Sequence, residues 1–341
     1  MVVAVDANGA DLGPAEVAAG AALAAQRGVR VLLFGPAAEI EAPPTGVEVV
    51  DAPLSIAKSP DPARAARANP ESSIVQAARA VAEGRAQALV CAGGTGAALA
   101  AGLFNVKRAR GVHRPALALA LPVPGRPVTL LDVGASAQAR PEHLVQFAFM
   151  GAALASVLLD VPRPRVGLLS NGEEQGRGSP LVVVARAELT ERLAAAAGAA
   201  PFELVGNVEG GDLTSGVADV VVTDGFTGNV ALKVAEGVSQ TVLRAVRDAA
   251  HSSPRAKLGG LLLTPSLRAF REQVDPEGQG GAYLLGLRRL GVVPHGSFTR
   301  RGFSEAILRA ARGAQEDLVG RTHAALERAG ALRDSPIRTG R

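Results

Sequence analysis

Residues 88–104 read ALVCAGGTGAALAAGLF. The stretch opens with four apolar residues, turns on glycines within residues 93–96, and continues as an alanine-rich segment. An apolar run, a glycine turn and a helical segment in that order form the unit from which parallel sheets are built. We expect a strand over Ala88–Cys91 and a helix over Thr95–Phe104.

The same alternation of strand-like and helix-like segments extends to both sides of this stretch. It predicts an α/β fold of Rossmann-like type, with a largely parallel sheet covered by helices on both faces. In such sheets the ligands bind at the carboxyl ends of the strands. The other expected strands are Val2–Val5, Val29–Phe34, Val47–Asp51, Ala116–Leu121, Val128–Leu131, Val166–Ser170, Phe202–Val205 and Val217–Thr223. The other expected helices are Pro14–Gln26, Ser72–Glu83, Glu142–Leu159, Pro180–Ala197 and Asn229–Asp248.

Composition narrows the class of protein. The 341 residues are 48% hydrophobic and 20% charged, as in ordinary globular chains. The single Cys91 excludes an intramolecular disulfide and a cysteine-based zinc site, and no HExxH, EF-hand or GxSxG motif occurs. We therefore expect no metal and no cofactor. The N-terminus lacks signal-peptide features, and the longest apolar run, Phe147–Leu159, is too short to span a bilayer, so we expect a cytoplasmic protein.

The charge of the chain points to anionic ligands. A formal net charge of +4 and a pI near 9.8 favour anionic substrates, acidic proteins or acidic lipid surfaces. Nucleic acid is a poor fit, because aromatic residues make up only 3% and no RNP-type motif is present.

The glycine turn is the first candidate binding site. Gly94, Thr95 and Gly96 open the expected helix, where free N–H groups and the positive end of the helix favour phosphate. Leu99 breaks the GxGxxG pattern and no GK[ST] follows, so neither a dinucleotide fingerprint nor a P-loop is present. A tight turn without a ligand is the alternative.

Carboxylates and two basic residues supply the candidate chemistry. Asp132 and Asp224 end strand-like runs, as Asp6 does. Three carboxylates at strand ends of one sheet favour a shared site. The alternative is that each aspartate only caps a turn or a helix. Arg177 lies in a polar glycine-rich loop and could bind phosphate, unless the loop is only a solvated surface. His295 stands between Pro294 and Gly296 and could carry a proton or bind an anion, unless it is structural.

The segment from Gly237 to Arg271 is basic and has an apolar centre. It holds six Lys or Arg residues against the single acid Asp248. We expect a protruding helical hairpin over residues 237–275, whose apolar Leu261–Leu263 would contact a membrane or bury in a dimer interface. The hairpin belongs to a single domain over residues 1–330, followed by a flexible tail at 331–341.

Ten segments in a fixed order carry a family resemblance. They run over residues 2–310 and resemble the phosphate acyltransferase family, above all in PEHLVQFA and DGFTGNVALK. The matching segments are residues 4–11, 92–97, 131–135, 141–148, 166–169, 206–210, 224–233, 280–282, 284–286 and 295–297.

The resemblance implies an activity and partners. Proteins of this family move a fatty acyl group from acyl-carrier protein to inorganic phosphate, and the acyl phosphate then serves a membrane glycerol-3-phosphate acyltransferase in phospholipid synthesis. The family is similar in fold to phosphotransacetylases and isopropylmalate-type dehydrogenases. Its members are cytoplasmic homodimers that associate peripherally with membrane. In DGFTGNVALK we assign Asn229 and Lys233 to substrate binding.

The residues suggest a direct mechanism. Phosphate would bind at Gly94–Gly96 with help from Arg177 and His295, and attack the thioester carbonyl itself. Backbone N–H groups near Gly225–Asn229 would stabilise the oxyanion, while Asp132 and Asp224 orient cations. A covalent route through Cys91 or a serine is the alternative. We disfavour Cys91 because it lies in an expected strand.

Some positions depart from the family pattern. The family has Asn where Gly94 and Ser136 stand, and Lys where Arg177 stands, and arginine keeps the charge but does not transfer protons. These changes leave two rival functions open: a phosphotransacetylase acting on acyl-CoA, and a catalytically weakened membrane-associated scaffold.

Overall fold

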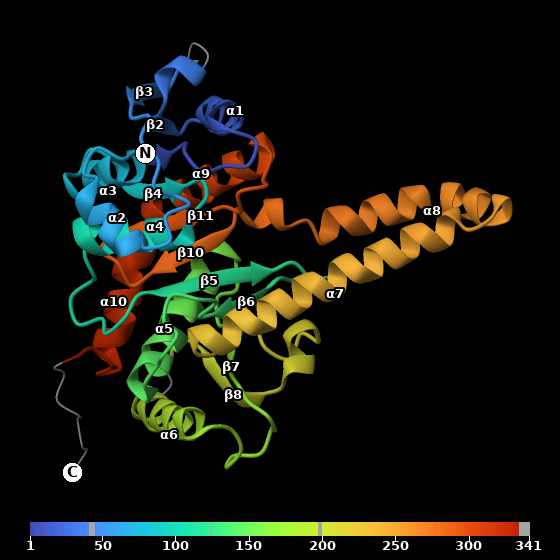
Figure 1. Ribbon diagram of the computed structural model, residues 1–341. Helices are drawn as coiled ribbons and strands as arrows, with labels where there is room; N and C mark the ends of the chain where they lie inside the picture. Colours follow the sequence, from blue (N-terminus) through green and yellow to red (C-terminus); the bar gives the residue numbers. More distant parts are fainter. Residues whose placement is uncertain (41–44, 124, 197–199, 334–341) are drawn as a thin grey trace.

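One continuous sheet of 11 strands runs through the body of the protein (Figure 1). The computed structural model describes residues 1–341 apart from 41–44, 124, 197–199, 334–341 and the side chain of residue 271. The strand order is β3-β2-β1-β4-β11-β10-β5-β6-β9-β7-β8. The strands are β1 (Val2–Asp6), β2 (Arg30–Gly35), β3 (Val47–Asp51), β4 (Ala88–Cys91), β5 (Ala116–Leu121), β6 (Val128–Leu131), β7 (Arg165–Leu169), β8 (Glu203–Val208), β9 (Val220–Val222), β10 (Ala282–Leu285) and β11 (Leu290–Val293).

Helices cover both faces of this sheet. In β1, Val3 and Val5 pack into one hydrophobic core, while Ala4 between them packs into the other. Residues of α1, α5, α6, α9 and α10 complete the first core, and residues of α2, α3 and α4 the second. The helices are α1 (Pro14–Gln26), α2 (Pro62–Ala68), α3 (Ser73–Ala82), α4 (Thr95–Ala101), α5 (Pro141–Leu158), α6 (Pro180–Ala195), α7 (Gly225–His251), α8 (Pro254–Gln273), α9 (Arg300–Gln315) and α10 (Leu318–Arg328).

The predicted α/β class and largely parallel sheet are confirmed. Seven of the ten strand pairings among the described residues are parallel. The exceptions lie in the middle of the sheet, where β10 is antiparallel to β11 and to β5, and β5 is antiparallel to β6. We did not expect β10 and β11 as strands, because each is only four residues long and their neighbours come from distant parts of the chain.

These antiparallel pairings divide the strands into two sets of opposite direction. The carboxyl ends of β1, β4 and β11 share one end of the sheet, because these strands are mutually parallel. The carboxyl ends of β6, β9, β7 and β8 lie at the other end, because β6 runs opposite to β5. Loops that follow strands of the two sets therefore emerge at opposite ends of the sheet.

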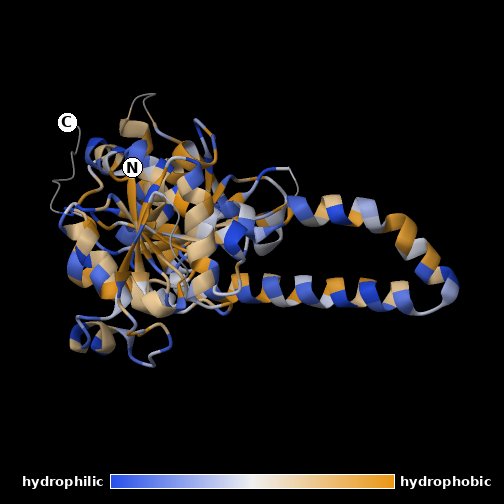
Figure 2. Ribbon diagram, turned by 90° about the horizontal axis from the view of Figure 1, so that it is seen from above, coloured by the Kyte–Doolittle hydropathy of each residue, from blue (hydrophilic) through white to orange (hydrophobic). Residues whose placement is uncertain are grey.

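A long helical hairpin projects from the body (Figures 1 and 2). It is formed by α7, of 27 residues, and α8, of 20 residues, so that α7 alone is about 40 Å long. The helix expected over Asn229–Asp248 is the central part of α7, which begins at Gly225 and ends at His251. Among the described residues, no helix has both the length and the apolar character needed to cross a membrane.

Two other expectations concern segment ends. The helix expected over Thr95–Phe104 is α4, which ends at Ala101 and continues as a π-helix, η2 (Gly102–Val106). The expected flexible tail at 331–341 lies outside the described residues from residue 334 onward.

Candidate functional site

The Gly94 turn packs against two other backbone segments at the carboxyl ends of β1 and β4. A Cβ added at Gly94 would lie 2.3 Å from the carbonyl oxygen of Ala57, and one at Gly9 would lie 2.7 Å from that of Ala92. Gly93 also has a φ of 135°, which disfavours other residues. These glycines are needed where three main chains meet, whether or not a ligand binds.

The first turn of α4 nevertheless has donors to offer. Among the described residues, no acceptor receives a hydrogen bond from the backbone N–H groups of Gly94, Thr95 or Gly96, and no side chain caps this helix. Thr95 and Gly96 are exposed. Uncapped N–H groups at a helix start bind anions, so the turn can accept a phosphate group.

His295 follows β11 and lies at the same end of the sheet as this turn. The N–H of Asp11, in the loop after β1, donates to the carbonyl of Gly296 at 2.8 Å. The backbone N–H of Ser297 donates to Nδ1 of His295 at 3.3 Å. In a neutral ring the proton is then on Nε2, which makes the exposed His295 a hydrogen-bond donor.

Asp6 is buried beneath the turn. It is 2% exposed and accepts hydrogen bonds from the N–H of Asn8 at 3.1 Å and from Sγ of Cys91 at 3.5 Å. Burial raises the pKa of Asp6 from 3.8 to about 7 and also raises the pKa of the Cys91 thiol well above its ordinary value. A buried thiol that resists ionisation is a poor nucleophile, which weighs against a covalent route through Cys91.

Asp132 organises the loop at the opposite end of the sheet. Its Oδ1 accepts from the N–H groups of Leu117, Gly134 and Ala135 at 2.9–3.1 Å, and its Oδ2 accepts from that of Ser136 at 2.8 Å. The residue is fully buried, and burial raises its pKa while the four donors oppose that shift. Asp132 therefore holds backbone together and contacts no cation among the described residues.

Asp224 caps α7. Its Oδ1 accepts from the N–H groups of Phe226 and Thr227 at 3.0 and 2.9 Å, and its carbonyl accepts from Gly228. The N–H of Gly225 donates to the carbonyl of Ser136 at 3.0 Å. The structure thus gives protein acceptors to the N–H groups expected to form an oxyanion hole near Gly225–Asn229, so this hole is not formed here.

The two residues assigned to substrate binding in α7 have protein partners. Asn229 donates from Nδ2 to the carbonyl of Val133 at 3.2 Å, which ties α7 to the Asp132 loop. The exposed Lys233 pairs with Glu236 at 2.7 Å.

Arg177 lies far across the sheet from the Gly94 turn. It lies in the loop after β7. Six strand positions separate β7 from β4 in the sheet, which corresponds to about 29 Å at the usual spacing between neighbouring strands. Its side chain is 64% exposed and lies 3.6 Å from Glu174. Asn207, which we did not single out, holds this loop by donating to the carbonyls of Gly172, Glu174 and Arg177.

The expected composite site is therefore divided. The structure brings together the Gly94 turn, Asp6 and the His295 loop, and separately joins the Asp132 loop to the start of α7. It does not bring Arg177, Asp132 or Asp224 to the Gly94 turn. It also places Ala57, and hence the exposed Lys58, beside that turn, which no local pattern signalled.

One side-chain cluster has the composition of a metal site. Ligand atoms of His113, Glu142 and His143 lie within 4.8 Å of one another. However, Nδ1 of His143 accepts from the backbone N–H of Arg140 at 3.1 Å, and burial lowers the pKa of His143. The neutral ring then carries its proton on Nε2 and has no lone pair left for a metal, so the cluster does not fit one.

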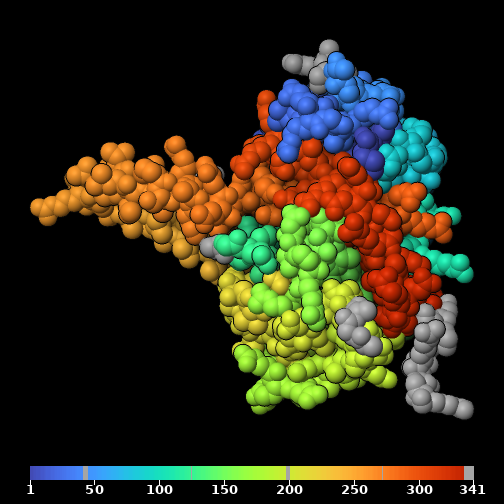
Figure 3. Space-filling model, turned by 180° about the vertical axis from the view of Figure 1, so that it is seen from behind, coloured from blue at the N-terminus to red at the C-terminus, as the bar shows by residue number. Residues whose placement is uncertain are grey.

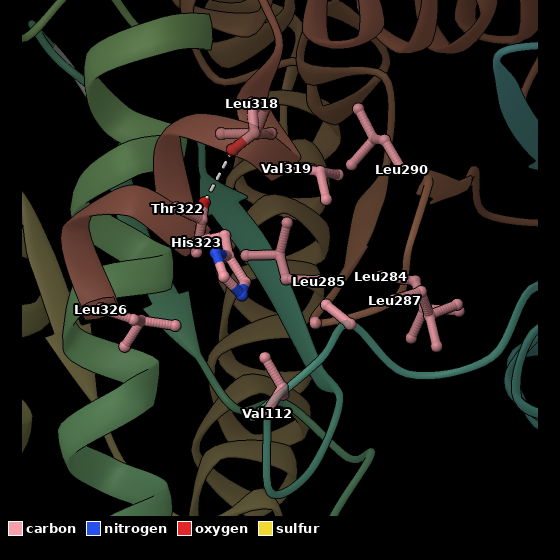
Figure 4. Close-up of a pocket in the computed structure, with 12 residues that line it drawn as sticks. Val112, Leu284, Leu285, Leu287, Leu290, Leu318, Val319, Thr322, His323 and Leu326 are labelled. Atoms are coloured by element: carbon pink, nitrogen blue, oxygen red, sulfur yellow. Dashed lines mark hydrogen bonds between the residues drawn. The ribbon is translucent and has the colours of Figure 1, made fainter. Parts of the chain in front are cut away.

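The apolar pocket beneath α10 is too small for an acyl chain (Figure 4). Leucine side chains of β10, β11 and α10 line it, yet its volume is only about 20 Å³. A cavity of that size holds about one water molecule, so it is a packing gap.

We predict that Asp6→Asn abolishes a pH dependence of stability. Because the folded-state pKa of Asp6 is raised to about 7, the folded protein keeps a proton that the unfolded chain releases from about pH 4. The free energy of unfolding should therefore fall as pH rises from 4 to 7. At pH 8 the variant should be more stable than the wild type, by up to about 4 kcal/mol. Urea titrations at several pH values measure this, and equal slopes for both proteins would contradict it.

We also predict that Asp132→Asn destabilises the fold by about 2–3 kcal/mol, because an amide nitrogen would replace an acceptor of backbone N–H groups. Ser136→Ala is the matched control. Among the described residues the Oγ of Ser136 makes one long hydrogen bond of 3.5 Å, and its loss should cost under about 0.5 kcal/mol. Chemical denaturation compares the two, and equal losses would refute the role given to the carboxylate.

Comparisons with known proteins agree with this architecture. Residues 1–321 match the model of a family described as fatty acid synthesis protein. A protein of Heliobacterium modesticaldum named phosphate acyltransferase is 40% identical over 328 residues, covering 94% of this chain and 96% of its own. One of the same name from Geobacillus sp. WCH70 is 41% identical over 333 residues, covering 96% and 99%.

Solved structures show the same fold at low identity. The EutD phosphotransacetylase of Staphylococcus aureus aligns with a TM-score of 0.61 at 16% identity, covering 92% of this chain and 94% of its own. A phosphotransacetylase of Streptococcus pyogenes gives the same values. The full-length match to the family model and the relatives near 40% identity place the chain in a family of acyltransferases: it belongs to the phosphate acyltransferases of fatty acid synthesis.

Proposed function

We propose that this acyltransferase moves a fatty acyl group from acyl-acyl-carrier-protein to inorganic phosphate, giving acyl phosphate for phospholipid synthesis. The observation that carries the proposal is the start of α4, whose first N–H groups have no acceptor in the described chain. The name phosphate acyltransferase carried by the relatives supports phosphate as the acceptor.

In this proposal phosphate binds at the Gly94–Gly96 turn. The N–H groups of Gly94, Thr95 and Gly96 donate to its oxygens, and Nε2–H of His295 is the further donor at this end of the sheet. Lys58 adds a positive charge beside the turn. At the opposite end of the sheet, we assign Asp132, Asp224 and Asn229 to holding the start of α7. Arg177 and Lys233 contribute only through their positive charge, at a distance from the Gly94 turn.

The reaction then needs no nucleophile from the protein. An oxygen of the bound phosphate attacks the thioester carbonyl carbon, and a C–O bond forms as the C–S bond breaks. The sulfur leaves as thiolate and takes the proton that the attacking hydrogen phosphate loses, which leaves acyl phosphate and the free thiol of the carrier. The protein supplies proximity and hydrogen bonds to the developing oxyanion.

Thr95→Pro tests the phosphate site. Proline is well tolerated at the first helical position, and Gly94 before it is extended, with φ −65° and ψ 104°. The variant thus removes one N–H donor and keeps the helix. We expect KM for phosphate to rise at least tenfold while the thermal midpoint stays within a few degrees. The measurement is thiol release from palmitoyl-acyl-carrier-protein as a function of phosphate concentration.

Thr95→Val is the matched control, because it removes the hydroxyl and keeps the N–H. Equal KM values for the wild type and Thr95→Pro would place phosphate elsewhere. Faster transfer from palmitoyl-CoA than from the carrier protein would favour a phosphotransacetylase-type enzyme. A folded wild-type protein without phosphate-dependent release would favour the scaffold.

The hairpin supports two further proposals: a homodimer and peripheral attachment to membrane. α7 carries an apolar residue at every fourth position, in a stripe that shifts by about 40° around the helix with each step, and each is 46–66% exposed in the single chain. These residues are Phe226, Val230, Val234, Val238, Val242 and Val246. A stripe of this length needs a partner, and the same stripe of a second copy fits it.

The α8 end of the hairpin fits a membrane surface. Leu261, Leu262 and Leu263 are 57–75% exposed, and basic residues such as Arg255 and Lys257 precede them. Exposed leucines flanked by cations bind the interface of anionic bilayers.

We predict that the two surfaces separate by mutation. Replacing Leu261, Leu262 and Leu263 by Asp should abolish sedimentation with phosphatidylglycerol vesicles and leave the dimer intact, because the charges oppose burial in lipid. Val234→Asp with Val238→Asp should give a monomer, because two carboxylates cannot be buried unpaired in the stripe. Light scattering measures the mass of each variant. Vesicle binding that survives the leucine changes would remove the membrane proposal and leave that of the dimer.

A further inference from the structure

The segment after α4 has unusual backbone geometry. The helix passes into the π-helix η2 and ends at Lys107, which adopts φ 70° although it is not glycine. Short π-helices and left-handed non-glycine residues are costly and occur preferentially at functional sites. The segment that begins at Lys107 is therefore a place where a functional surface is expected.

Six cations come together there from two parts of the chain. We call them the basic rim: Lys107, Arg108, Arg110, Arg114, Arg288 and Arg289, all exposed. The two parts are joined through their backbones. Arg108 forms a β-bridge with Leu287, and the N–H of Arg288 donates to the carbonyl of Lys107 at 3.0 Å. The N–H of Ala109 donates to the carbonyl of Gly286 at 3.0 Å.

Among the described residues, no acidic side chain neutralises the charge of the basic rim. Eleven ion pairs occur among the described residues, yet none involves any of these six side chains. Like charges held this close repel one another and lower stability, so the arrangement favours an anionic partner. Six cations spread along an edge suit the acidic surface of a protein better than one small anion.

A cavity and a helix face lead from the basic rim to the phosphate site. The cavity, of about 390 Å³, is lined by Leu103, Lys107, Arg108, Gly111 and other residues. Thr95, Leu99, Leu103 and Lys107 follow one another at every fourth position along α4 and η2, and all are at least partly exposed. The seven residues of α4 span about 10 Å, and the five residues of η2 continue from there to Lys107.

We infer that the basic rim is the docking surface for the acidic carrier protein of the proposed reaction. The inference rests on that proposed function. The carrier's acidic surface lies on the rim, the phosphodiester of its prosthetic arm enters the cavity, and the arm follows Leu103 and Leu99. Its thioester then reaches the Gly94–Gly96 turn.

The position of the basic rim favours a protein over a membrane. Residues 107–114 and 287–289 lie on the side of the body opposite the tip of the hairpin (Figures 1 and 3). In Figure 3 the teal and orange side chains of these two segments project next to each other from that edge. A bilayer that touches Leu261–Leu263 would leave this edge free in solution.

The test reverses charge at the basic rim. The rim variant combines Arg108→Glu, Arg288→Glu and Arg289→Glu. The matched control combines Arg30→Glu, Arg79→Glu and Arg163→Glu. These three arginines are also exposed and form no ion pair among the described residues. We expect KM for palmitoyl-acyl-carrier-protein to rise at least tenfold in the rim variant alone. KM for phosphate and the rate with palmitoyl-pantetheine should stay within twofold. Replacement of the same three residues by Lys should restore the low KM.

Binding of the fluorescent carrier protein by anisotropy separates this inference from the proposed function. Tight, salt-sensitive binding that the rim variant loses supports docking even if no acyl transfer is seen. Equal binding by the rim and control variants overturns the inference, and leaves the phosphate site untouched. Loss of binding to phosphatidylglycerol vesicles in the rim variant, with carrier binding unchanged, would make the rim a membrane contact and also overturn it.

Discussion

The antiparallel strands in the middle of the sheet are the constraint on which the rest of this structure depends. Because β10 pairs antiparallel with β11 and β5, and β6 pairs antiparallel with β5, the strands from β6 to β8 run opposite to β1 and β4. Loops of the two sets leave the sheet at opposite ends. The Gly94 turn, where we propose that phosphate binds, is thereby separated from the loop that starts the hairpin, although both come after strands of one sheet.

The two helix starts differ in where their backbone donors go. In α7 the carboxylate of Asp224 and the carbonyl of Ser136 accept the first N–H groups, so the helix is complete without a ligand. In α4 no side chain caps the helix, and Gly94 packs on the carbonyl of Ala57. Unsatisfied donors at a helix start favour an anion, and of these two helices α4 is the one that has them. The distinction comes from hydrogen bonding, because both starts contain glycines.

Charge and apolar surface are distributed in a way that keeps different contacts apart. The apolar stripe of α7 and the leucines of α8 lie on the hairpin, whereas the basic rim lies on the opposite side of the body. Under the function that we propose, the acyl group comes from a carrier protein and the product is delivered near a membrane, which requires two such surfaces. Each can then be occupied without displacing the other.

The sequence alone determined the local elements and the class of fold. The bounds of α1, β4, β5 and β6 agree with those expected. These bounds depend on the spacing of apolar residues and on nearby glycines and prolines, which shape the backbone over only a few residues. The glycine turn was also located from sequence. Only the tertiary structure decided that β10 and β11 enter the sheet, that Arg177 lies away from Gly94, and that residues 107–114 meet 287–289. Strand order and direction depend on hydrogen bonds between residues far apart in the chain, such as Ala282 with Leu119, and no local pattern encodes them.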